Sequence, residues 1–221
     1  MPEVITIDQT RLAQINALHA GSHSQGDQMC AMEAVAFVAH EPWSDHPQCA
    51  SPVIGAFMRA WNDGLPDAER SDLLLPLIPR LVGTRGSAAL EERRSLMAAD
   101  WLVRKHTPAW LELAGLKDQA AMLRGLPEIT SMAQVPSIRS PLEAVRKDAA
   151  AAWDAARAAA GAAARDAAWA AAGAAAGDAA RAAAGDAAGA KLKPTRDALQ
   201  QSALRLIERM IEAEEPEVTH A

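Results

Sequence analysis

Two cysteines and two histidines lie close together with the spacing Cys30-x9-His40-x5-His46-x2-Cys49. Zinc prefers such side chains, four of them in a tetrahedron. We expect residues 29–40 to form one helix, however, and ten helical residues place Cys30 and His40 about 15 Å apart. These two side chains then cannot share one ion with Cys49. The sequence therefore predicts no bound metal and no cofactor, and Cys30, His46 and Cys49 remain the weaker alternative ligand set.

Three acidic or basic side chains are candidates for general acid–base catalysis: Glu33, Asp45 and His46. Glu33 is the one charged residue in the apolar stretch 29–40, and a dry pocket would raise its pKa into the range of a useful acid or base. The commoner arrangement is a carboxylate that pairs with an arginine or caps a backbone. The available arginines are Arg80, Arg85, Arg93 and Arg94.

The segment Trp43-Ser44-Asp45-His46 combines an aromatic ring, a hydroxyl, a carboxylate and an imidazole. Adjacent loop residues rarely form a catalytic triad, because a triad is assembled from several elements. Tryptophan is enriched at binding hot spots, so we interpret this loop as a contact surface. In the alternative interpretation, Trp43 is a packed plug and Ser44 and Asp45 cap local turns. The predicted binding residues are Trp43, His46, Arg85, Arg157 and Arg165.

Helix signals that must position these residues recur along the chain, and no segment has a convincing strand pattern. Asp8 is expected to cap a helix that reaches about His19, and Asp27 to cap the helix at 29–40. Ser51 and Pro52 form a cap-plus-proline start for a helix that Gly64 ends. Further helices are expected at residues 67–75, at 87–105, from Thr107-Pro108 onward, and at about 118–123. The predicted fold class is all-α.

Residues 153–190 repeat every four positions, with two variable residues followed by Ala-Ala. Alanine is the strongest helix former, so the tract predicts a long helix that begins at Ser140-Pro141 and ends before Pro194. It is either a spacer or a rigid display of Trp and Arg to a partner. We expect a compact helical domain at 1–135, the alanine-rich helix at 140–193, and an acidic C-terminal helix and tail at 195–221, packed back on the rest.

The chain has 221 residues and a formal net charge of −6. This charge disfavours a general nucleic-acid-binding protein, which would present a basic face. No uncharged apolar run is long enough to span a membrane. Residues 1–9 contain two acids and no basic residue, which is unlike a signal peptide. We therefore expect a cytoplasmic protein that binds neither membranes nor nucleic acid.

The tract at 153–188 resembles the alanine-rich repeats of all-helical immunity proteins of bacterial polymorphic-toxin systems, the Imm5-like group. Residues 30–49 and 80–116 resemble uncharacterised proteins of actinobacteria and their phages, which bring no activity with them. The resemblance implies a helical protein that binds a protein partner stoichiometrically, as an immunity protein, an antitoxin or a component of phage–host conflict, rather than an enzyme. The alternative is a small enzyme or metal-binding protein that uses the region of Cys30, Glu33, His46 and Cys49.

Overall fold

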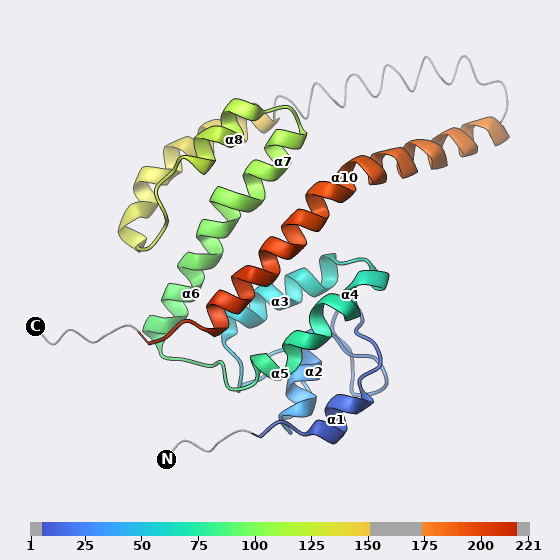
Figure 1. Ribbon diagram of the computed structural model, residues 1–221, viewed down its shortest axis with the longest axis vertical. Helices are drawn as coiled ribbons and strands as arrows, with labels where there is room; N and C mark the ends of the chain where they lie inside the picture. The colour runs from blue at the N-terminus through green and yellow to red at the C-terminus, as the bar shows by residue number, and fades with distance from the viewer. Residues whose placement is uncertain (1–5, 151–173, 216–221) are drawn as a thin grey trace, which may run out of the picture. The chain divides into compact units, whose positions relative to one another are not determined.

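The computed structural model describes residues 6–150 and 174–215, with side chains for 6–150 and 189–215 (Figure 1). Within these ranges the regular structure is helical and contains no strand, which confirms the predicted all-α fold. The chain divides into two compact units: unit 1 comprises residues 1–98 and 204–221, and unit 2 comprises residues 99–203. Each unit is described by itself.

Unit 1 is built around one short helix that is apolar on nearly every side. Its elements are α1 (Gln9–Gln14), α2 (Ala31–Val38), α3 (Pro52–Gly64), α4 (Asp67–Leu74), a 3-10 turn (Leu75–Leu77), α5 (Ile78–Leu81), most of α6 (Ala88–Trp101) and the end of α10 (Ala174–Ile211). Helix α2 contacts α1, α3 and α5, and its only side chain that is not buried is Phe37. A helix that is apolar on nearly every side is stable only in the middle of a core, which is where α2 lies.

The core of unit 1 joins helices from both ends of the chain. Fully buried side chains come from α3 to α5 and from the end of α10: Ile54, Met58, Leu74, Ile78, Leu81, Ile207 and Met210. Arg94 on α6 is also buried, and its Nε donates to Met210 O at 2.9 Å. The C-terminal helix is therefore packed against other helices, as expected.

Unit 2 contains a π-helical turn at Leu102–His106, α7 (Thr107–Leu113), α8 (Lys117–Arg124), a 3-10 turn (Met132–Gln134) and a helix at residues 135–150. Helices α7 and α8 lie side by side (Figure 1). Its core includes the buried side chains Leu111, Ala120, Leu123 and Val145. The sequence suggested a new helix at Thr107-Pro108, but the π turn carries α6 into α7 without a break. The wider turn accommodates Pro108, which has no N–H to donate.

Two other proline-based boundaries were wrong. Helix α10 runs through Pro194, where the sequence predicted its end. An interior proline costs about 3 kcal/mol, but alanines precede it and packed residues such as Ile207 follow it. The helix at residues 135–150 begins before Pro141, where the sequence predicted its start. A capping box formed by Ser131 and Gln134 starts the helical segment earlier.

Two helices near the N-terminus are shorter than predicted. Asp8 does cap α1, accepting from Thr10 N and Arg11 N, but the helix ends at Gln14 rather than near His19. Helix α2 is capped by Cys30 instead of Asp27. Both differences lengthen the irregular segment between α1 and α2. At the start of α3 the prediction was right, because Ser51 Oγ accepts from Ile54 N behind Pro52.

Candidate functional site

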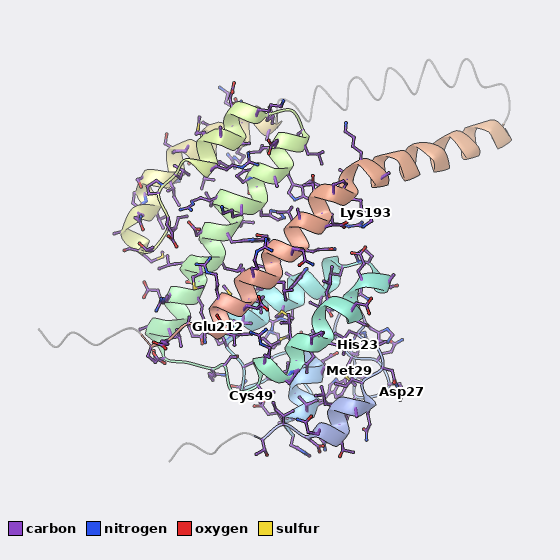
Figure 2. All side chains as sticks on the ribbon, viewed as in Figure 1. His23, Asp27, Met29, Cys49, Lys193 and Glu212 are labelled. Atoms are coloured by element: carbon purple, nitrogen blue, oxygen red, sulfur yellow. The ribbon has the colours of Figure 1, made fainter. Side chains whose placement is uncertain are left out.

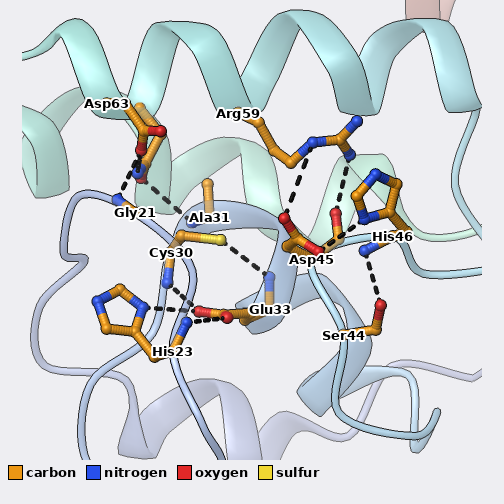
Figure 3. Close-up of polar contacts among 11 residues, drawn as sticks. Gly21, His23, Cys30, Ala31, Glu33, Ser44, Asp45, His46, Arg59 and Asp63 are labelled. Carbon is orange, nitrogen blue, oxygen red and sulfur yellow. Dashed lines mark hydrogen bonds and ion pairs between the residues drawn. The ribbon is translucent and has the colours of Figure 1, made fainter.

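Two irregular loops flank helix α2, and Figure 3 shows His23 of the first and Ser44, Asp45 and His46 of the second. We name residues 15–30, which precede α2, the clamped loop, and residues 39–50, which follow it, the histidine loop. Trp43 Nε1 donates to His23 O at 2.7 Å and so joins the two loops. The Trp43 ring also packs edge-on against Phe37, with 6.5 Å between centroids. The two loops therefore form one continuous surface.

Glu33 holds the clamped loop from inside the protein. Only 1% of this residue is exposed, and its carboxylate accepts from Cys30 N at 2.7 Å and from His23 N at 2.5 Å. His23 Nδ1 lies 2.9 Å from Glu33 Oε2, the oxygen that also accepts from Cys30 N. Glu33 therefore caps backbone N–H groups of the clamped loop, which is one of the two arrangements expected from the sequence, rather than pairing with an arginine of the described residues. Glu33 closes a capping box with Cys30 and is engaged in structure rather than directed at a substrate.

The C-terminal end of α3 supplies a second clamp. Asn62 is completely buried; its Oδ1 accepts from Ala31 N at 3.2 Å and its Nδ2 donates to His19 O at 2.8 Å. Asp63 Oδ1 accepts from Gly21 N at 2.7 Å. Gly21 has a φ of +86°, a conformation that glycine adopts without strain. The clamped loop is thus irregular in backbone and fixed in position.

Arg59 on α3 holds the tip of the histidine loop. Its Nη1 donates to Asp45 O at 2.9 Å, and its Nε lies 4.0 Å from Asp45 Oδ2. Asp45 Oδ1 in turn lies 2.6 Å from His46 Nδ1. The His46 side chain is 65% exposed. With Nδ1 held by the carboxylate, Nε2 is the ring nitrogen left to bind an outside group.

Arg85 holds the other end of the histidine loop. Its Nη1 donates to Gln48 O at 3.1 Å and to Gln48 Oε1 at 3.0 Å, while its backbone N–H donates to Cys49 O at 3.2 Å. Gln48 N also donates to Glu41 Oε2 at 2.5 Å. Arg85 was predicted as a binding residue; in the structure it is exposed and contributes to the shape of the loop.

Both cysteines are buried free thiols. Burial raises the pKa of Cys30 to about 12, and burial together with the Glu41 carboxylate raises the pKa of Cys49 to about 11. Each is therefore protonated near neutral pH, whereas metal binding and nucleophilic attack require the thiolate. His40 turns away to Asp8, with 2.8 Å between Nε2 and Oδ2. Across the described residues, no three or more His, Cys, Asp and Glu side chains form a group that could hold a metal ion.

Of the remaining predicted binding residues, Trp43 lies within the described part of the chain. Trp43 is half-buried and makes the two contacts described above, so the plug interpretation accounts for its position. Arg157 and Arg165 lie outside the described residues. Sequence reasoning missed Asn62 and Arg59, because nothing in a helix pattern distinguishes a polar residue that binds a distant loop from one that faces water.

Comparisons with protein families, curated proteins and solved structures found no match to this chain. None of the helices within the described ranges combines the length and the apolar character that crossing a bilayer requires.

Proposed function

We propose that this protein acts by binding a protein partner stoichiometrically, in the manner of an immunity protein or antitoxin, and that the histidine loop is its main contact surface. The observation that carries the proposal is the exposed His46 on a loop held by Arg59 at its tip and Arg85 at its base. A loop ordered during folding loses little further entropy on association, which favours affinity.

The chemistry of the neighbouring groups supports binding more than catalysis. The Glu33 carboxylate is occupied by its own loop, and the thiols of Cys30 and Cys49 are protonated at neutral pH. The groups that remain accessible are an imidazole with one free nitrogen and, beside it, the partly exposed Asp45. Such groups add hydrogen bonds and orientation to a protein interface.

The experiment uses the full-length chain and the product of the neighbouring gene, mixed and analysed by calorimetry and sedimentation. We expect a one-to-one complex that His46→Asn weakens by roughly tenfold, as expected for a residue central to an interface. Glu92→Gln is the control: Glu92 is exposed on α6 of the same unit and lies outside the histidine loop, so this change should leave the affinity unchanged. A folded His46→Asn variant with unchanged affinity, or the absence of a complex, would overturn the proposal.

A further inference from the structure

A pocket of about 460 Å³ opens beside the clamped loop. Its apolar lining includes Ile15, Met29 and Phe37, and its polar lining includes His19 and Asp27. This volume falls within the range of roughly 300–1,000 Å³ that is typical of sites for small ligands or single side chains. The pocket adjoins the surface already described, because Phe37 lines it and also packs against Trp43.

The pocket is preformed by buried polar groups. Its wall between residues 15 and 29 has no regular secondary structure, yet Glu33 fixes it at His23 and Cys30, and Asn62 fixes it at His19. Burying a carboxylate and an amide is unfavourable unless their hydrogen bonds are made, so these contacts hold the wall in one conformation. The pocket therefore exists before any ligand arrives.

The charges at the pocket are not balanced. Asp27 is exposed on the clamped loop near Met29 (Figure 2), and no described residue forms a hydrogen bond or ion pair with its carboxylate. Arg11, whose guanidinium lies 4.9 Å from the centre of the Phe37 ring, is already engaged by Phe37 O and by Asp8. An apolar floor with one free carboxylate at its edge matches a ligand with an alkyl stem and a cationic head.

We propose that this pocket receives a lysine or arginine side chain from the protein partner, with the stem on Met29 and Phe37 and the cation at Asp27. The inference rests on the proposed function and names the chemistry of the partner's anchor. The net charge of −6 supports it, because an acidic chain attracts a basic surface. The histidine loop and the pocket would then contact the partner together.

The first experiment uses the full-length protein and n-butylammonium as a probe, followed by NMR of the Met29 methyl group and the Gly26 amide. We expect saturable shifts with a Kd on the order of millimolar, and no such shifts with n-butyrate. Asp27→Asn should weaken the binding of n-butylammonium roughly two- to fivefold, the range for an exposed ion pair. Glu92→Gln removes one negative charge from exposed α6 in the same unit and should have no effect. Equal binding of butyrate, or no saturable shift with butylammonium, would show that the pocket does not select cations.

The second experiment separates this proposal from the proposed function. It measures the affinity of wild-type, Asp27→Asn and Glu92→Gln proteins for the product of the neighbouring gene. A complex weakened by Asp27→Asn alone supports the anchor. If the complex forms and Asp27→Asn leaves its affinity unchanged, the anchor is wrong while the binding function stands. If no complex forms although butylammonium binds, the pocket is a site for a small organic cation, and a partner side chain is not its occupant.

Discussion

The two loops beside α2 each contain a histidine whose Nδ1 is held by a carboxylate, but the two pairs differ in burial. The His23 and Glu33 side chains are 15% and 2% exposed, and those of His46 and Asp45 are 65% and 25% exposed. The buried carboxylate also binds two backbone N–H groups and fixes a loop, whereas the exposed pair leaves one imidazole nitrogen facing solvent. The same pair of groups therefore stabilises structure in one loop and is available for binding in the other.

The largest expected effect on the free energy of unfolding comes from removing the buried carboxylate of Glu33. Glu33→Ala leaves the buried N–H groups of His23 and Cys30 without an acceptor, so we expect a loss of about 3–5 kcal/mol in the free energy of unfolding. Urea denaturation followed by circular dichroism measures it. Glu33→Gln retains an acceptor oxygen and should lose less. If Glu33→Ala unfolds with nearly wild-type stability, the clamp is not what holds this loop.

The junction of the two loops should give the next largest effect. Trp43→Ala removes the hydrogen bond to His23 O and the contact with Phe37, and we expect a loss of about 2–3 kcal/mol for a half-buried aromatic side chain. Trp43→Phe keeps one ring but loses the hydrogen bond and part of the indole's contact area, so we expect a smaller loss of about 1–2 kcal/mol. Chemical denaturation of the two variants side by side tests this ranking. Equal losses would mean that the ring contact contributes nothing.

A third histidine, in unit 2, extends the comparison to a pair without a carboxylate. Trp110 Nε1 donates to His106 Nε2 at 3.2 Å, the His106 ring lies 5.1 Å from that of Trp101, and burial lowers the pKa of His106 below 6.5. At a pH between the lowered pKa of His106 in the folded protein and its ordinary pKa of 6.5, the unfolded chain binds a proton that the folded chain does not. Lowering the pH from above 6.5 should therefore destabilise the fold.

The measurement for His106 is the denaturation midpoint by tryptophan fluorescence at pH 7.5 and pH 5.5. We expect a smaller fall in stability between these two pH values in His106→Gln than in the wild-type protein, because this titrating group is gone. Other groups titrate equally in both proteins and cancel in the comparison. An identical fall in both would show that His106 does not contribute to the pH dependence.

The smallest effect on stability should come from the exposed pair. Asp45→Ala breaks contacts to His46 and leaves Arg59 bound to the backbone, so the loss should stay below about 1 kcal/mol. The measurement is the same urea titration that serves for Glu33→Ala. A loss as large as that of Glu33→Ala would remove the distinction between the two loops.

The sequence by itself determined the helical fold and several helix starts. Ser51-Pro52 and Asp8 begin helices as predicted, and the apolar residues 31–38 form the buried centre of unit 1. These features depend on neighbours within one or two helical turns, where capping and apolar periodicity act. Proline was the least reliable local signal, since Pro108 and Pro194 lie within continuous helical segments whose packing outweighs the missing hydrogen bond.

Only the tertiary structure decided which polar residues hold the loops and which face outward. Asn62 binds Ala31 and His19, 31 and 43 residues away. The difference between buried Glu33 and partly exposed Asp45 depends on what the fold places around each carboxylate. Asp45 lies next to His46 in the sequence, whereas Glu33 lies ten residues from His23, so no local pattern pairs Glu33 with its histidine. The role of each carboxylate follows from its burial and from the number of donors that reach it, and both are properties of contacts between segments distant in the chain.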